Sequence, residues 1–145
     1  MAIDPVIEKA AFEVVERYIA AINAGDEDGV RDAFNFPHFR IGMGGRVVHY
    51  PDASTNPLAN FREKTLTDSW YRSKIDNLEA LATFPGKAHV GVHFRRLRED
   101  GSEIGAYYSL YNFLSKGSGG VMAMIAGAAL QAVGFVPNQE QTPET

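Results

Sequence analysis

Residues 87–115 have the sequence KAHVGVHFRRLREDGSEIGAYYSLYNFLS, and this stretch decides the fold. Its first part alternates apolar and polar residues, which is typical of a β-strand with one buried face. The residues on the predicted buried face are Ala88, Val90, Val92 and Phe94. Asp100-Gly101 is a strong signal for a tight turn, and the tyrosine-rich residues 103–115 then form the partner strand. The stretch therefore predicts a long antiparallel hairpin.

The segments on both sides extend this hairpin into a larger sheet. Residues 70–84 form a long mixed segment that ends at Pro85-Gly86, a turn signal. Residues 121–129 are predicted to be the last strand, although their alanines would also suit a helix. Residues 36–41 and 46–50 flank a glycine-rich turn, so they predict a second hairpin.

The N-terminal part of the chain has a helical pattern instead. Asp4 suits a helix N-cap and Pro5 suits the first helical position, where its missing N–H costs nothing. The apolar residues that follow at helical spacing are Ile7, Ala11, Val14, Val15, Tyr18 and Ile22. Gly25 is a typical end for this helix, Asp26 can cap a second short one, and residues 56–67 predict a third.

Helices followed by a meander of long strands define an α+β protein. We expect a cone-shaped, curved antiparallel sheet that is wrapped around the N-terminal helices and encloses an internal apolar pocket. Residues 1–132 are predicted to form a single domain, and residues 133–145 a polar tail without an apolar anchor.

The composition excludes several classes of function. The net charge of −4 over 145 residues argues against a nucleic-acid partner, which normally requires a basic patch. No cysteine is present, so disulfides, thiolate catalysis and cysteine-bound metals are excluded. The N-terminus lacks the pattern of a secretory signal, and the most apolar stretch, residues 121–136, is too short and broken to span a bilayer comfortably. We therefore expect a soluble cytoplasmic protein with no membrane partner.

Several stretches spread over residues 5–132 carry a resemblance to a known family. They are residues 15–26, 34–41, 45–48, 70–79, 87–96, 100–101 and 107–111. On these residues the chain resembles the nuclear transport factor 2-like superfamily, which includes ketosteroid isomerase, scytalone dehydratase and SnoaL-like cyclases. It is most similar to uncharacterised bacterial members that share the motif Phe34-Asn35-Phe36-Pro37-His38. The resemblance implies the same cone-shaped fold.

One branch of this superfamily has functional residues that the chain lacks. Ketosteroid isomerases use an aspartate near the end of the first strand and an acid on a later strand. The corresponding positions here are Gly42 and Ser109, which argues against steroid isomerisation by that mechanism.

His38 and Arg40 are candidates for a functional site because they share one face of residues 36–41. On a concave face they would bind or polarise an anionic or carbonyl ligand, with His38 titrating near neutral pH. The alternative is that they lie on the outer face or make structural hydrogen bonds.

Asp76 is an even number of positions from Trp70 and Leu78, so on a regular strand the three side chains share a face. Asp76 would then point inward beside an aromatic ring. Burial would raise the pKa of its carboxyl group and suit it to general-base catalysis. A His38–Asp76 pair would then resemble the dehydratase branch of the superfamily. The alternative is a structural link between Asp76 and an arginine or the backbone.

Aromatic side chains complete the predicted site. Tyr18 belongs to the apolar stripe of the first helix, so its buried hydroxyl needs a partner and could act as an oxyanion donor. The predicted ligand-binding residues are Arg40, Trp70, Tyr111 and Phe61. Tyr108 falls on the opposite strand face from Tyr111, and tyrosines on such a face are common at dimer interfaces.

The sequence predicts neither a metal ion nor a cofactor. His89 and His93 are four residues apart on a strand, which separates them by about 13 Å, too far for one ion. No phosphate loop or dinucleotide fingerprint is present.

Two functions fit these residues. The first is a cofactor-independent lyase, isomerase or cyclase acting on a small apolar carbonyl compound, with His38, Asp76 and Tyr18 as catalytic residues. The second is a non-catalytic ligand-binding or dimerisation module of the same fold. In either case we expect a homodimer that forms through the convex face of the sheet.

Overall fold

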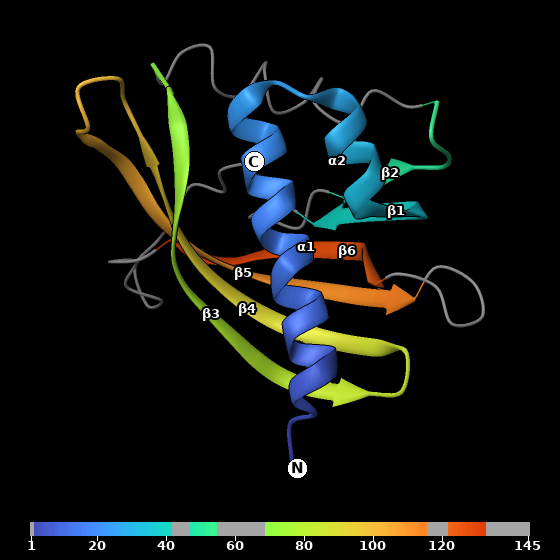
Figure 1. Cartoon of the computed structure of the whole chain (residues 1–145). Helices are drawn as coiled ribbons and strands as arrows, with labels where there is room; N and C mark the ends of the chain where they lie inside the picture. The colour runs from blue at the N-terminus through green and yellow to red at the C-terminus, as the bar shows by residue number, and fades with distance from the viewer. Residues whose placement is uncertain (1, 42–46, 55–68, 116–121, 133–145) are drawn as a thin grey trace.

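A computed structural model describes residues 2–41, 47–54, 69–115 and 122–132, the last range as strand backbone. In these residues two helices precede six strands, which form one sheet (Figure 1). The helices are α1 (Pro5–Ala24) and α2 (Glu27–Ala33). The strands are β1 (Phe34–Ile41), β2 (Val47–Tyr50), β3 (Arg72–Phe84), β4 (Lys87–Leu97), β5 (Glu103–Ser115) and β6 (Met122–Ala132). Neither described helix is long and apolar enough to cross a membrane.

The sheet has the strand order β2-β1-β6-β5-β4-β3. Neighbouring strands are antiparallel except for β1 and β6, which run parallel. The long strands bend around α1, which lies across their concave face (Figure 1). The predicted α+β class and the curved, mainly antiparallel sheet around N-terminal helices are therefore confirmed. The predicted third helix at residues 56–67, with Phe61, and the tail at residues 133–145 lie outside the described residues.

Local sequence explains where the helices begin and end. The Asp4 carboxylate accepts a hydrogen bond from the backbone N–H of Val6 at 2.9 Å, which satisfies a donor that has no partner within α1. At the other end Gly25 has a φ of 67°, a left-handed conformation that glycine adopts without strain. Asp26 then caps α2 by accepting a hydrogen bond from the N–H of Gly29 at 3.0 Å. The predicted caps are confirmed.

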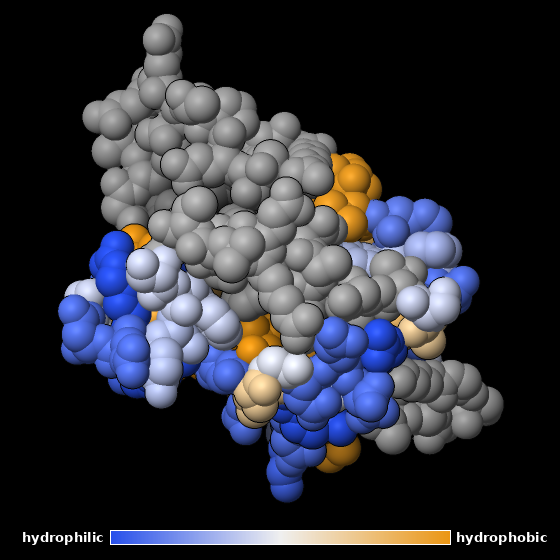
Figure 2. Space-filling model, turned by 90° about the horizontal axis from the view of Figure 1, so that it is seen from above, coloured by the Kyte–Doolittle hydropathy of each residue, from blue (hydrophilic) through white to orange (hydrophobic). Residues whose placement is uncertain are grey.

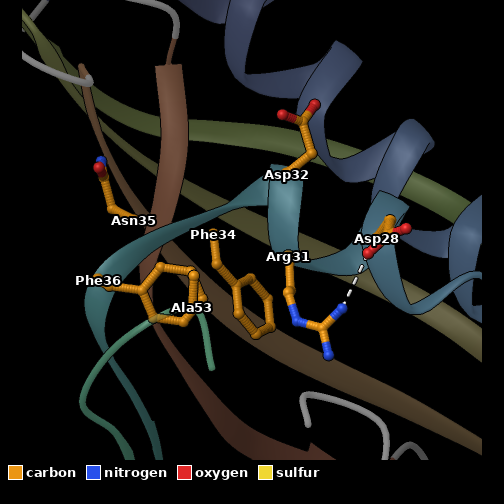
Figure 3. Close-up of a pocket in the computed structure, with 7 residues that line it drawn as sticks. All are labelled: Asp28, Arg31, Asp32, Phe34, Asn35, Phe36 and Ala53. Carbon is orange, nitrogen blue, oxygen red and sulfur yellow. Dashed lines mark hydrogen bonds and ion pairs between the residues drawn. The ribbon is translucent and has the colours of Figure 1, made fainter. Parts of the chain in front are cut away.

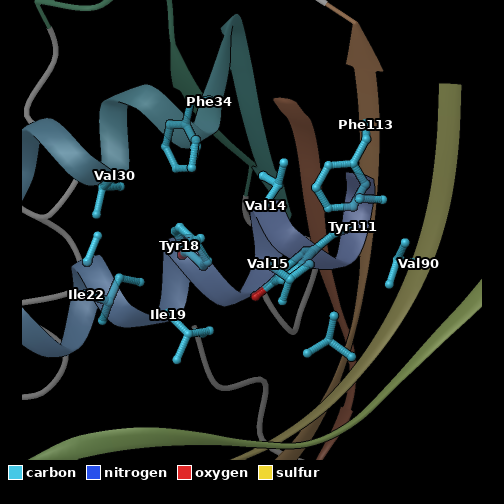
Figure 4. Close-up of a cluster of buried hydrophobic side chains, with 14 of the residues drawn as sticks. Val14, Val15, Tyr18, Ile19, Ile22, Val30, Phe34, Val90, Tyr111 and Phe113 are labelled. Atoms are coloured by element: carbon cyan, nitrogen blue, oxygen red, sulfur yellow. The ribbon is translucent and has the colours of Figure 1, made fainter. Parts of the chain in front are cut away.

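The core lies between α1 and the concave face of the sheet (Figure 4). α1 contributes one buried stripe, while β4 and β5 contribute mainly alternate residues. The largest fully buried apolar side chains are Val14, Val15, Val30, Phe34, Val90, Val92 and Phe113. Burial of each stabilises the fold by about 1.5–3 kcal/mol. Seen from above, the described surface is mainly hydrophilic, with hydrophobic residues in separate small patches (Figure 2).

The C-terminal end of α1 is tied to the start of β3. Asn23 Nδ2 donates to the carbonyl oxygen of Ser73 at 2.9 Å, and the N–H of Ser73 donates back to Asn23 Oδ1 at 2.7 Å. The indole Nε1 of Trp70 donates to the Ser73 hydroxyl at 3.1 Å. These bonds hold α1 in place across the sheet and so help to position Tyr18 on its inner face.

Candidate functional site

The two polar residues of β1 face the helices. His38 is fully buried and Arg40 is half-buried, whereas Phe39 and Ile41 are 38% and 44% exposed. Because side chains alternate along a strand, β1 directs His38 and Arg40 to the concave face. The prediction that His38 and Arg40 share one face of the strand is confirmed, and this face is the inner face of the sheet.

Arg40 lies within a ring of aromatic side chains. Its guanidinium carbon is 5.0 Å from the ring centre of Tyr18, and 5.3 Å from those of Phe34 and Tyr111. These are distances at which a cation is attracted to the face of a ring. Electrostatic attraction also couples the guanidinium to the hydroxyl groups of Tyr18 and Tyr111. The Arg40 cation of β1 thus contacts side chains from two other elements, α1 and β5.

The electrostatics of this cluster set the charge of its members. Burial raises the pKa of the Tyr18 hydroxyl well above its ordinary value, although the Arg40 cation acts in the opposite direction. Burial also disfavours the charge on Arg40, but the hydroxyls of Tyr18 and Tyr111 outweigh this and raise the pKa of the guanidinium. The cluster therefore pairs a permanent cation with a neutral Tyr18 hydroxyl, and both are hydrogen-bond donors.

His38 is packed as an aromatic ring. It stacks on Phe34 with ring centres 3.7 Å apart and planes inclined by 8°, and the ring centre of Tyr50 is 5.7 Å away. Its exposed fraction is 0%. This packing favours the structural alternative for His38, and its role in acid–base catalysis stays a prediction.

Asp76 does not face the core. The register between β3 and β4 skips one residue between Ile75 and Asn77, so Asp76 is the extra residue of a β-bulge. The residues that pack against the core on either side, Ile75 and Leu78, are consequently three positions apart rather than two. The prediction of an inward-pointing Asp76 is wrong because the bulge reverses the alternation at this residue.

The Asp76 carboxylate instead binds Arg95 on the convex side of the sheet. Arg95 Nε donates to Oδ2 and Nη2 donates to Oδ1, each at 2.9 Å. These charge-assisted hydrogen bonds hold the pKa of Asp76 below its ordinary value. The prediction of a raised pKa is therefore wrong, and the alternative link to an arginine is the one that forms. His38 and Asp76 are not brought together, since one lies in the aromatic core and the other on the outer face.

The other predicted ligand-binding residues have separate locations. Tyr111 is a member of the Arg40 cluster, Trp70 packs against the edge of the core, and Phe61 lies outside the described residues. Sequence reasoning missed Phe34 and Tyr50, whose rings flank His38. The available signal for Tyr50 is the hairpin itself, because the register of β1 and β2 places it opposite His38.

Neither of two surface depressions is lined by the Arg40 cation. The first, of ≈ 530 Å³, lies between α2 and β1 and includes the Arg31–Asp28 ion pair (Figure 3). Its lining residues are Asp28, Arg31, Asp32, Phe34, Asn35, Phe36 and Ala53. The second, of ≈ 570 Å³, includes Asp76 and Arg95 among its lining residues. An internal pocket around Arg40 stays a prediction. Within the described ranges, no cluster of three or more histidine, aspartate and glutamate residues could hold a metal ion.

The described fold is that of a cone-shaped α+β protein, and comparison with known proteins agrees. No protein-family model matches the chain, and no curated protein matches its sequence. Solved structures do match over most of its length. One is a protein of unknown function with a cystatin-like fold from Nostoc punctiforme, with a TM-score of 0.70 and 14% identity. The match covers 94% of this chain and 98% of that one.

Two further structures match the chain over most of its length. Aln2 from a Streptomyces species has a TM-score of 0.69 and 14% identity, covering 89% of this chain and 93% of that one. A nuclear transport factor 2-like superfamily protein from Salmonella enterica serovar Typhimurium has a TM-score of 0.67 and 15% identity, covering 94% and 98%. Similarity at this identity shows the fold alone. The chain therefore has the nuclear transport factor 2-like fold, as its sequence resemblance implied.

Proposed function

We propose that the protein binds a small apolar molecule on the concave face of its sheet, through a carboxylate or carbonyl oxygen. Arg40, Tyr18 and Tyr111 would recognise that oxygen. The observation that carries the proposal is the position of the Arg40 guanidinium, which β1 holds within 5.3 Å of the rings of both tyrosines.

The chemistry of the cluster suits an oxygen ligand. Arginine has no hydrogen-bond acceptor, so the O–H proton of each tyrosine is the group that it can offer to a ligand. A hydroxyl close to a cation is polarised and becomes a better donor. Two such hydroxyls beside a positive charge would stabilise an oxyanion in surroundings of low dielectric constant.

The residues beyond this cluster would contact the apolar part of the ligand. Ile75 and Leu78 of β3 and Phe94 of β4 are partly buried and pack against the core from the concave side. Trp70 hydrogen-bonds to Ser73 at the start of β3. A ligand whose oxygen binds Arg40 would direct its hydrocarbon portion along this apolar wall.

Catalysis is the second candidate function. A lyase, isomerase or cyclase acting on an apolar carbonyl compound needs an oxyanion donor, and Tyr18 with its bound Arg40 has the chemistry of one. Such a reaction also needs a base, and the position of Asp76 on the outer face removes the carboxylate predicted for that role. Binding without catalysis is therefore the function that the geometry supports better.

A titration of the 145-residue chain with octanoate and 1-octanol tests the proposal. These probes share a hydrocarbon chain and differ in the charged head group. Arg40→Met should weaken octanoate binding about 10- to 100-fold and change 1-octanol binding much less. Arg95→Met, which removes an arginine from the convex face, is the control and should leave both affinities unchanged. Octanoate affinity that is equal in Arg40→Met and wild type would refute the assignment.

We also propose that two copies associate through the convex face of the sheet. Leu81, Phe84 and Leu114 on this face are 43%, 39% and 39% exposed. Tyr108 lies against His93 with ring centres 4.4 Å apart, which presents a pair of aromatic rings with polar tips. Such surfaces are enriched at interfaces between protein chains. Sedimentation at micromolar concentration should give a dimer, and a monomer there would refute the association.

A further inference from the structure

Gly127 occupies a central position in the row of residues at the Arg40 site. β6 separates β1 from β5, and its register pairs Gly127 with Arg40 on one side and with Tyr111 on the other. Residues paired in this way share a face of the sheet. Because neighbouring strands are about 4.8 Å apart, Arg40 and Tyr111 start from backbones about 9.6 Å apart, with Gly127 between them.

We infer that Gly127 is a positioning residue whose missing side chain allows Arg40 to reach Tyr111. The Arg40 guanidinium carbon is 5.3 Å from the Tyr111 ring centre. A side chain at position 127 would stand on the same face, in the path that Arg40 crosses.

The residue type itself supports this inference. Glycine is depleted in strands because it adds conformational entropy to the unfolded chain and has no side chain to pack. In a strand interior it often marks a place where another group approaches the backbone closely. Position 127 lies inside β6, and its register partner on β1 is Arg40.

The consequence for binding rests on the proposed function. If Arg40 and Tyr111 together recognise an oxygen of the ligand, Gly127 determines the spacing of these two donors. A larger residue would separate the cation from the Tyr111 hydroxyl and weaken binding of a carboxylate. It would affect a neutral molecule of the same shape much less. Gly127 is then a determinant of specificity for the head group of the ligand.

The positioning role can be tested without a ligand. Side-chain protons of Arg40 lie close to three aromatic rings, so ring currents shift their NMR signals in the wild-type chain. These signals are assigned by their loss in Arg40→Met. Gly127→Val should move them toward the values of an exposed arginine, and Gly127→Ala should move them less, in the same direction.

Ala128→Val is the matched control, because it adds a comparable volume one residue further along β6. The register pairs Ala128 with Ile41 and Leu110, which belong to the convex face. Arg40 signals should keep their wild-type shifts in this variant. If a folded Gly127→Val chain also keeps them, the inference is overturned. If the valine variant does not fold, the same result in Gly127→Ala overturns it.

Octanoate binding separates this inference from the proposed function. Displaced Arg40 signals together with about 10- to 100-fold weaker octanoate binding in Gly127→Val would support both. Displaced signals in a protein whose wild type does not bind octanoate would support the positioning role and count against the proposed function. Displaced signals with an unchanged octanoate affinity would overturn the specificity role of Gly127.

Discussion

Replacing Arg40 with methionine should destabilise the protein strongly for a residue that is only half-buried. Methionine retains the hydrocarbon part of the side chain but removes the cation. The hydroxyls of Tyr18 and Tyr111, on residues 8% and 4% exposed, would lose their charged polar neighbour. A buried polar group that loses its partner costs about 1–3 kcal/mol, and loss of the cation–π contacts adds about 0.5–2 kcal/mol.

Part of this loss is offset because the variant no longer has to desolvate a charge. We therefore expect the free energy of unfolding to fall by about 2–4 kcal/mol. For a chain of this size that corresponds to a melting temperature lower by about 4–16 °C. Urea unfolding followed by circular dichroism measures the free energy, and calorimetry measures the melting temperature.

Arg95→Met is again the matched control. Arg95 lies on the same sheet but forms an exposed ion pair with Asp76, and exposed pairs contribute little to stability. Its removal should therefore change the free energy of unfolding only slightly. Equal losses in the two variants, or an Arg40→Met chain as stable as wild type, would refute the reasoning that the aromatic cluster depends on its cation.

Three further outcomes are expected. Burial raises the pKa of Tyr18 in the folded chain above its unfolded value of 10.0, so the stability from this group is complete below that pH and is lost as the pH rises above it. Urea unfolding at increasing alkaline pH should show this loss in wild type and a smaller one in Tyr18→Phe, and identical slopes would contradict it. Asn23→Ala removes both side-chain hydrogen bonds to Ser73 and should lower the free energy of unfolding by about 1–3 kcal/mol, measured in urea. Gly91→Ala places a Cβ against the Tyr108 hydroxyl and should cost about 1–3 kcal/mol in the wild-type chain. The same substitution should cost little in Tyr108→Ala, and equal costs in both backgrounds would show that the contact is not the cause.

Much of the fold could be predicted because its signals are local. The bounds predicted for β5, residues 103–115, are those observed, since a turn dipeptide and a run of strand-forming residues mark them. Which residues share a face of β1 and of β4 follows from simple alternation, which holds as long as a strand contains no bulge. The caps of α1 and α2 depend on residues next to the helices and were predictable for the same reason.

The candidate site could be predicted only in part. His38 and Arg40 share a face because they are two residues apart on a regular strand. Asp76 was assigned to the wrong face because a β-bulge reverses the alternation, and a bulge depends on the register with β4. No local pattern in residues 70–84 distinguishes a bulged strand from a regular one.

The sequence by itself determined the two described helices, the strands and, where a strand has no bulge, which side chains share a face, because these follow from backbone geometry over a few neighbouring residues. Only the tertiary structure decided that Arg40 meets Tyr18 and Tyr111, and that it does so across Gly127. Those contacts depend on the order and register of strands far apart in the chain. Strand order and pairing register are set by packing of the whole sheet against α1, so they cannot be read from the sequence of a single segment.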